Sequence, residues 1–188
     1  MQPRTEGRQH LQSFLVQIRP HAQLFAYSDY LGNAVYHFNV PGAHETLTIT
    51  AESTLEMAPH AALPDRLPAE SWSALRECTA NGENWDMLQP SRLARSSSLL
   101  RRFAASLAID WARLDPLSGL RALNASLYAN YGYDADANPT HEPIDESLSA
   151  GRGTCQDFAH IMTVIARAQG IPCRYVSGYI YRSPESRD

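Results

Sequence analysis

The sequence predicts an α+β protein in which an N-terminal antiparallel β domain precedes a helical core. Three observations predict this class. Apolar residues alternate with polar ones through much of residues 12–56, apolar residues recur at spacings of three and four from Leu99 onward, and a proline-rich segment separates the two patterns. We place the β domain with its linker at residues 1–85 and the core at residues 86–188, where helices come first and an antiparallel sheet follows.

Three alternating runs define the β domain. Their apolar members are Phe14, Val16 and Ile18, then Tyr36, Phe38 and Val40, then Leu47, Ile49 and Ala51. Because successive side chains of a strand point to opposite faces, this alternation predicts that each strand buries one face. Gly32 and Asn33 supply the turn before the second run. We therefore expect one small antiparallel sheet.

Residues 57–90 are predicted to connect the two domains. They contain Pro59, Pro64, Pro68 and Pro90, and proline lacks the backbone donor that helix interiors and central strands need. We expect no long helix here, only a short helical turn near residues 71–76. The domain boundary should fall within this segment.

Two amphipathic helices follow. The apolar stripe of the first comprises Leu99, Leu100, Phe103, Ala104, Leu107 and Trp111, and that of the second comprises Leu120, Leu123, Leu127 and Tyr131. Serines at residues 96–98 can cap the first helix. The pair Asp115-Pro116 ends it and starts the second, because proline suits a first helical turn. A shorter helix at residues 142–150 is expected to end at Gly151.

The loop before that shorter helix resembles a calcium-binding loop at three positions. Asp134, Asp136 and Asn138 have the alternating spacing of oxygen ligands. However, Pro139 occupies the position that needs glycine, and Asp145 is too short to replace the bidentate glutamate. We therefore interpret the loop as a solvated turn and expect no metal site and no cofactor.

Residues 151–178 contain the strongest candidate for chemistry. A glycine-flanked loop leads to Cys155 at the start of an apolar helix that ends at Gly170, and Thr154 and Asp157 have the spacing of a capping box. The free amides and the positive dipole end of a helix N-terminus favour the thiolate, which is the reactive form of cysteine. Cys155 is therefore a candidate nucleophile, although a lone cysteine before an apolar run is more often a small buried hydrophobic residue.

Three motifs follow one another in order along this stretch. They are Gly153-Thr154-Cys155-Gln156-Asp157, then Arg167-Ala168-Gln169-Gly170-Ile171-Pro172-Cys173-Arg174, then Val176-Ser177-Gly178-Tyr179. These motifs resemble those of the transglutaminase-like superfamily, particularly its bacterial members. The β domain extends the resemblance through the turn at residues 29–33, the pair His37-Phe38 and the strand at residues 48–53. The resemblance implies a papain-like core whose central helix begins at the nucleophile.

The resemblance also implies the chemistry, which is acyl transfer or the hydrolysis of an amide or peptide through a Cys155 thioester. The backbone N–H of Cys155 is the expected oxyanion donor, with Gln156 as a weaker one. Gly153 and Thr154 complete the expected substrate loop, where the glycine lets a substrate approach the sulfur. Asp157 is expected to cap the helix.

The resemblance places the catalytic histidine and aspartate on strands after Tyr179. We therefore expect both residues beyond residue 188 and expect this chain alone to be inactive. His160 lies five residues after Cys155, about 140° around the helix, so the two side chains should diverge. The remaining histidines, His141 among them, are expected to be structural or solvent-facing.

The remaining cysteines and the overall charge exclude several other classes. Cys78 and Cys173 are expected to be structural, and the three cysteines form neither a disulfide framework nor a zinc spacing. The formal net charge of −4 gives no basic field for nucleic acid or an anionic membrane. Neither a membrane span nor the apolar core of a signal peptide is evident. We expect a cytoplasmic protein with a protein or peptide substrate.

Two hypotheses about function follow. In the first, the chain is the N-terminal part of a transglutaminase-like cysteine hydrolase or acyltransferase. In the second, it is a non-catalytic interaction module that reuses the same fold. A core cut at residue 188 would leave the strand at residues 174–181 without neighbours, so we also expect self-association through an incomplete sheet.

Overall fold

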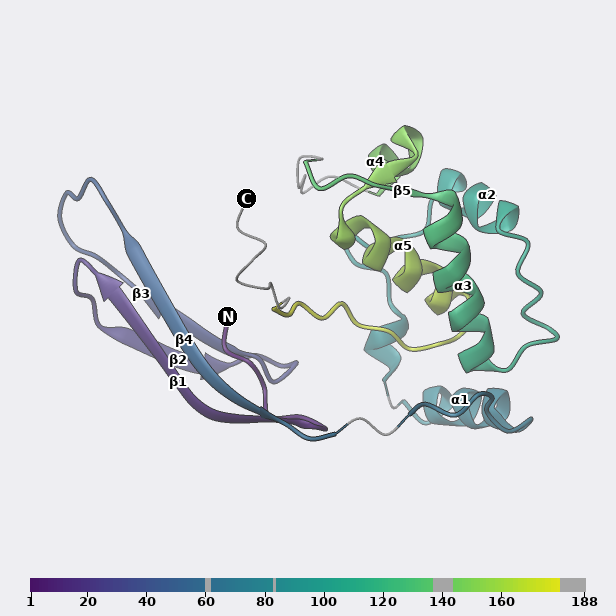
Figure 1. The fold of residues 1–188 in the computed structure, drawn as a ribbon, viewed down its shortest axis with the longest axis horizontal. Helices are drawn as coiled ribbons and strands as arrows, with labels where there is room; N and C mark the ends of the chain where they lie inside the picture. Colours follow the sequence, from purple (N-terminus) through teal and green to yellow (C-terminus); the bar gives the residue numbers. More distant parts are fainter. Residues whose placement is uncertain (60–61, 83, 137–143, 180–188) are drawn as a thin grey trace. The chain divides into compact units, whose positions relative to one another are not determined.

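The computed structural model of the chain describes residues 1–59, 62–82, 84–136 and 144–179. Contacts divide these residues into two compact units, Met1–Leu63 and Pro64–Tyr179 (Figure 1). The first unit contains strands and the second contains the helices, which confirms the predicted α+β class. No helix in the described ranges is long and apolar enough to cross a membrane. The predicted domain boundaries stay a prediction.

The first unit consists of four strands that pair in two antiparallel sheets. The strands are β1 (Gln9–Arg19), β2 (Leu24–Ser28), β3 (Ala34–Phe38) and β4 (Thr48–Met57). β1 pairs with β4, and β2 pairs with β3. The prediction of a single sheet was therefore wrong. It missed β2 because Leu24–Ser28 has large apolar residues on both faces and no alternation.

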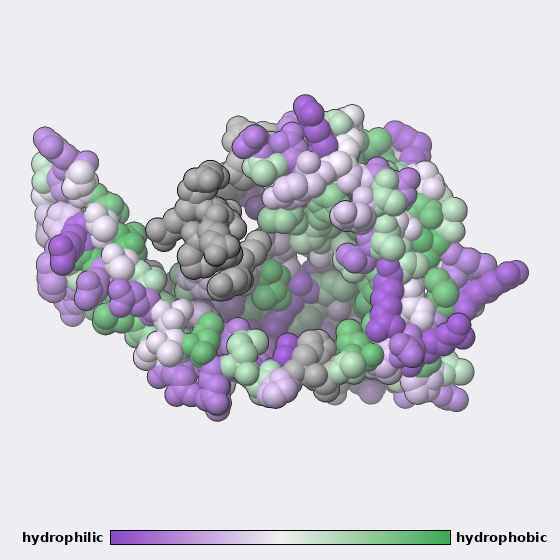
Figure 2. All heavy atoms as spheres, viewed as in Figure 1, coloured by the Kyte–Doolittle hydropathy of each residue, from purple (hydrophilic) through white to green (hydrophobic). Residues whose placement is uncertain are grey.

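One face of β1 is partly or fully buried, whereas neither face of β4 is. In β1, Phe14 and Val16 are half-buried and Ile18 is buried, whereas all ten residues of β4 are exposed. The prediction that β4 buries a face was wrong. Within this unit β4 contacts β1 along one edge, and backbone pairing along an edge leaves both faces of a strand open. Figure 2 shows apolar residues (green) among polar ones (purple) on this unit.

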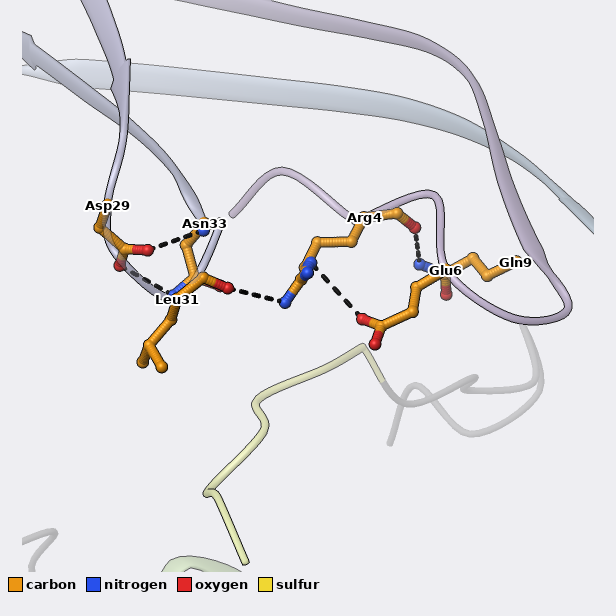
Figure 3. A network of polar contacts seen from close by, with 6 residues as sticks. All are labelled: Arg4, Glu6, Gln9, Asp29, Leu31 and Asn33. Atoms are coloured by element: carbon orange, nitrogen blue, oxygen red, sulfur yellow. Dashed lines mark hydrogen bonds and ion pairs between the residues drawn. The ribbon is translucent and has the colours of Figure 1, made fainter. Parts of the chain in front are cut away.

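The turn between β2 and β3 is fixed by a polar network (Figure 3). The Asp29 carboxylate accepts hydrogen bonds from the Asn33 backbone N–H at 2.8 Å and from its side-chain amide at 2.9 Å. These bonds lower the pKa of Asp29. Arg4 donates to the Leu31 carbonyl at 3.1 Å, and Gly32 has a φ of +77°, which favours glycine. The predicted turn at Gly32-Asn33 is confirmed.

A helix longer than predicted occupies the proline-rich segment. α1 spans Ser71–Ala80, and a 3-10 helix, η1, spans Trp85–Leu88. The expectation of only a short turn was wrong because residues 69–89 contain no proline, which leaves room for a ten-residue helix. The Trp72 indole N–H donates to the Leu114 carbonyl at 2.8 Å, and its ring packs edge-on against Trp111.

The next two helices start where their caps predict. α2 (Ser98–Ser106) is capped by the Ser97 hydroxyl, which accepts from the Leu100 N–H at 3.0 Å. α3 (Pro116–Asn130) is capped by Asp115. A hydrogen bond from the Ser118 hydroxyl is the main cause that lowers the pKa of Asp115 to about 2. α2 ends earlier than predicted, since Ala108 adopts a φ of +51° that no helix continues through.

The core of the second unit forms around α5 (Cys155–Ala168). α5 packs beside α3, and α4 (Asp145–Ala150) packs against α2 (Figure 1). The core cluster of buried residues comprises Ala94, Leu100, Leu107, Leu123, Leu127, Tyr131, Ile144, Leu148, Ile161, Val164 and Ile165. As predicted, the cysteine helix lies in the middle of this unit.

The segment after α5 differs from the prediction. Gly170 ends the helix with a φ of +79°, but residues 171–179 form no strand. A strand exists only through a ladder of hydrogen bonds with a neighbour, and here the Cys173 N–H makes a single backbone bond to the Met87 carbonyl at 3.1 Å. The predicted strand was therefore wrong over residues 174–179, while residues 180–181 lie outside the described residues. Self-association stays a prediction.

Candidate active site

The candidate nucleophile lies at the first position of the central helix. Thr154 is the N-cap of α5, and Cys155 is the first helical residue. The Cys155 side chain is exposed, although the helix that carries it is buried from His160 to Ala166 except at half-buried Met162. A buried helix thus holds an accessible thiol at its N-terminus.

The loop before Cys155 is held by a short parallel ladder. β6 (Arg152–Gly153) pairs with β5 (Gly132–Tyr133), which follows α3 directly. The Gly151 carbonyl accepts from the Gly132 N–H at 2.9 Å, and the Gly153 carbonyl accepts from the Asp134 N–H at 2.9 Å. An ion pair at 3.4 Å joins Arg152 to Asp134. The end of α3 therefore fixes the approach to the nucleophile.

Gly151 turns the chain from α4 into this ladder. It is the C-cap of α4 and has a φ of +67°, a left-handed conformation that glycine adopts without strain. The predicted end of the short helix at Gly151 is confirmed. Its predicted start at residue 142 lies outside the described residues, as do Asn138 and Pro139 of the calcium-like loop.

Asp157 ties the first turn of α5 to its cap. Its carboxylate oxygen Oδ2 accepts from the Thr154 backbone N–H at 2.8 Å and from the Thr154 hydroxyl at 3.0 Å. Thr154, the residue before Cys155, thus binds this carboxylate. The Cys155 N–H is one of the first amides of the helix, and such amides have no acceptor within the helix. Gln156 is half-buried beside it.

His160 does not serve the thiol in this structure. Its ring is only 8% exposed, stacks on Tyr175 with ring centres 4.9 Å apart, and has no hydrogen bond at either nitrogen within the described residues. Burial lowers the pKa of His160, the Asp157 charge raises it, and the Arg167 charge lowers it further. The other described histidines are His10, His21, His37 and His44, all in the first unit, while His60 and His141 lie outside the described residues.

The burial of His160 predicts a loss of stability in mild acid. Because the folded-state pKa lies below that of the unfolded chain, the unfolded state binds the proton first as the pH falls. We expect the stability of the second unit to decline as the pH drops below about 6.5, by at most about 1.4 kcal/mol per pH unit for one proton. Urea unfolding between neutral and mildly acidic pH, followed by the helical circular-dichroism signal, measures this slope.

Two substitutions isolate the contribution of this imidazole. His160→Phe keeps an aromatic ring against Tyr175 but cannot be protonated, so its slope with pH should be shallower than that of the unmodified chain. His37→Phe is the matched control, because His37 also stacks on a ring, that of Phe25, but is exposed. Equal slopes for the unmodified chain and His160→Phe would contradict the prediction.

Cys78 and Cys173 lie in different surroundings. Both are half-buried. Burial raises the pKa of the Cys173 thiol, which disfavours its reactive form. The Asn84 side-chain amide approaches the Cys78 sulfur at 3.5 Å. Cys155 is the exposed member of the three.

Sequence reasoning missed the contacts of two residues, one at the cysteine loop and one in the last turn of α5. Tyr131, expected only as a core aromatic, places its hydroxyl against the cysteine loop. Arg167 donates to the Cys173 carbonyl from Nε at 3.1 Å and from Nη2 at 2.5 Å, and to the Gln89 carbonyl from Nη1 at 2.6 Å. Its place in the Arg-Ala-x-Gly-Ile-Pro motif was the available signal for Arg167. The apolar stripe gave no such signal for the Tyr131 hydroxyl.

Comparisons with known proteins match both units. Residues 1–56 match the family model of the bacterial transglutaminase-like N-terminal region, and residues 106–187 match that of the transglutaminase-like superfamily core. An uncharacterized protein of Mycobacterium leprae is 29% identical over 179 residues, covering 95% of this chain and 62% of that protein. An uncharacterized protein of Mycobacterium tuberculosis is 30% identical over 189 residues, covering 97% and 59%. The chain thus spans about three fifths of these relatives.

One solved structure has the same fold. The crystal structure of "a Putative Cysteine Protease" from Cytophaga hutchinsonii superposes with a TM-score of 0.62 and 18% sequence identity. The match covers 90% of this chain and 56% of that one. It supports the predicted combination of an N-terminal β domain and a transglutaminase-like core.

Proposed function

We propose that this chain, which matches the bacterial transglutaminase-like N-terminal region and the transglutaminase-like superfamily core, supplies the cysteine nucleophile of an acyl-transfer or amide-hydrolysing enzyme. The observation that supports this proposal is the placement of Cys155. An exposed thiol occupies the first position of a buried helix, behind a loop that β5 and Asp157 hold in place.

The proposed reaction begins with attack of the Cys155 thiolate on the carbonyl carbon of a carboxamide or peptide bond. A carbon–sulfur bond forms, the carbon–nitrogen bond breaks, and the amine or ammonia leaves with a proton from an imidazolium. The resulting thioester is then resolved by water, which gives hydrolysis, or by a second amine, which gives acyl transfer. The identity of the acceptor separates a protease or amidase from a crosslinking enzyme.

The developing oxyanion would be stabilised by the helix that presents the sulfur. The Cys155 backbone N–H points out of the first turn of α5, where helical amides have no internal acceptor. The Asp157 carboxylate accepts from the neighbouring Thr154 N–H, and we propose that the Cys155 N–H binds the oxyanion. The Gln156 side chain is the weaker second donor that we propose.

The imidazole that this reaction needs would come from a histidine outside the described residues. His160 is buried against Tyr175. We propose that the full-length protein supplies a histidine, oriented by an aspartate or asparagine, from sequence beyond residue 188. Reading the gene beyond codon 188 tests this directly, since the absence of a histidine followed by Asp or Asn would contradict the enzymatic proposal.

The reactivity of Cys155 tests the proposal on the present chain. We expect iodoacetamide at neutral pH to label Cys155 at least about tenfold faster than Cys78, because the Cys155 thiol is exposed at a helix N-terminus whereas Cys78 is half-buried. Quantitative peptide mass spectrometry over time measures both rates in one sample. The difference should disappear in concentrated urea, where the helix is absent.

Turnover by the full-length protein is the second measurement. Release of ammonia or of an amine from a glutamine-containing peptide should fall to background in Cys155→Ala, while Cys78→Ala should retain activity. Equal labelling of Cys155 and Cys78 in the folded chain, together with no turnover, would favour the non-catalytic interaction module instead.

A further inference from the structure

The tyrosine at the end of α3 has a fixed position beneath the cysteine loop. Tyr131 is 4% exposed, and its ring packs edge-on against Phe158 with ring centres 4.8 Å apart and against Phe103 with ring centres 6.2 Å apart. Phe158 belongs to α5 and Phe103 to α2. Because two helices hold the ring, the position of its hydroxyl is fixed.

The Tyr131 hydroxyl is not explained by packing. Its oxygen is buried and makes no hydrogen bond of good geometry within the described residues, although the Ser147 side chain interacts weakly with it. Burial raises the pKa of Tyr131 to about 12, and the negative charge of Asp157 adds to this rise while the Ser147 side chain opposes it. A buried hydroxyl that is poorly hydrogen-bonded destabilises the fold, whereas phenylalanine would keep the ring contacts without that cost. Packing of the ring therefore does not explain why a hydroxyl is present.

The hydroxyl faces Gly153, two residues before the nucleophile. A Cβ atom on Gly153 would lie 2.4 Å from the Tyr131 hydroxyl oxygen, 2.6 Å from Asp157 Oδ2 and 2.9 Å from Asp157 Cβ. The φ of Gly153 is not positive, so the close contacts rather than the backbone conformation require glycine here. Tyr131 and Asp157 thus both occupy the space that a side chain at position 153 would need.

Hydrogen bonds also hold this loop. The Gly153 carbonyl accepts from the Asp134 N–H at 2.9 Å, and Asp157 accepts from the Thr154 N–H at 2.8 Å. Gly153 is therefore enclosed by β5, by the Tyr131 hydroxyl and by the Asp157 carboxylate immediately before the helix begins. A shift of this glycine would move the first turn of α5 and the thiol on it.

We propose that Tyr131 is a positioning residue for Cys155, whose buried hydroxyl acts with the Asp157 carboxylate to hold Gly153 and thereby sets how α5 presents the thiol. This inference rests on the proposed role of Cys155 as a nucleophile. It assigns Gly153 a role beyond substrate access, because the glycine admits the two side chains that fix the loop from within.

A double-mutant cycle tests the proposal on the 188-residue chain. Tyr131→Phe, Gly153→Ala and the double variant are compared by the rate of Cys155 alkylation with iodoacetamide, normalised to the folded fraction from circular dichroism. We expect Tyr131→Phe to slow labelling about threefold and Gly153→Ala about tenfold, since small displacements of reacting groups carry effects of this size or larger. The double variant should label faster than Gly153→Ala, because removing the hydroxyl relieves the closest contact of the new Cβ.

A tyrosine on the same helix provides the matched control. Tyr128 is 86% exposed, so Tyr128→Phe should leave the labelling rate unchanged. If Tyr131→Phe changes the melting temperature but not the normalised labelling rate, Tyr131 is only a core residue and the inference is wrong. The inference would also be wrong if the two substitutions acted independently, so that the fold-change in labelling rate of the double variant equalled the product of the two single fold-changes.

The outcomes separate this inference from the proposed function. If Cys155 in the unmodified chain labels no faster than Cys78, the nucleophile itself is contradicted. If Cys155 labels fast and Tyr131→Phe has no effect, only the positioning role fails. Should Gly153→Ala not fold, Tyr131→Phe still decides the question, because it removes a single oxygen atom and keeps the ring.

Discussion

Replacing Ile161 with alanine is expected to lower the free energy of unfolding of the second unit by about 4 kcal/mol. Ile161 lies in the middle of α5 and is completely buried in the core cluster. The substitution removes apolar contacts and leaves a cavity, and a rigid core relaxes only partly around it. Urea unfolding followed by the helical circular-dichroism signal measures the loss.

Ile161→Val is the graded control for this substitution. It removes one methylene and should cost only about 1 kcal/mol. Alanine has a higher intrinsic helix propensity than isoleucine. A loss of stability in Ile161→Ala therefore cannot come from a weaker tendency to form the helix. Equal stability of the two variants would show that the core collapses around the site without a cavity. The nucleophile would then not depend on a rigid central helix.

The second large effect is expected at Arg167, which ties the chain after α5 to the segment after η1. Its guanidinium donates to the carbonyls of Cys173 and Gln89, and all three bonds are between 2.5 and 3.1 Å. Arg167→Met keeps most of the apolar stem but leaves both carbonyls without this donor. We expect a loss of about 2–4 kcal/mol, because charged hydrogen bonds and unsatisfied partly buried carbonyls each carry 1–3 kcal/mol. The same urea titration measures it.

Arg121→Met is the matched control for Arg167. Arg121 also donates to a backbone carbonyl, that of Asp65 at 2.7 Å, but it is exposed. Its substitution should cost less than about 1 kcal/mol, as is usual at the surface. Limited trypsin digestion supplies a second readout, since cleavage after Arg174 should accelerate in Arg167→Met only. Similar losses in both variants would show that the guanidinium network is no stronger than a surface contact.

Much of the helical core could be predicted because its signals are local. Ser97 and Asp115 cap helices through residues two or three positions away, and Gly151 and Gly170 end helices through their own backbone conformation. The position of Cys155 at a helix start follows from the same kind of signal. Such interactions depend on neighbours in sequence, so the sequence alone is sufficient to read them.

Two of the errors arose where the outcome depends on distant partners. The run at Leu47–Ala51 alternates, yet β4 buries no face, because alternation describes a strand but not what covers it. Residues 174–179 have the composition of a strand but no ladder with a neighbouring strand. In each case the missing information was the identity of a neighbour in space.

The sequence by itself determined the α+β class, the capped helices and the placement of a candidate nucleophile at the N-terminus of an apolar helix. Only the tertiary structure decided that this thiol is exposed, that His160 is buried against Tyr175, and that the Tyr131 hydroxyl and Asp157 leave no room for a side chain at Gly153. The physical reason is the range of the interactions. Caps and periodicity act over one helical turn, whereas burial and the contacts of a loop are set by segments that folding brings together from far along the chain.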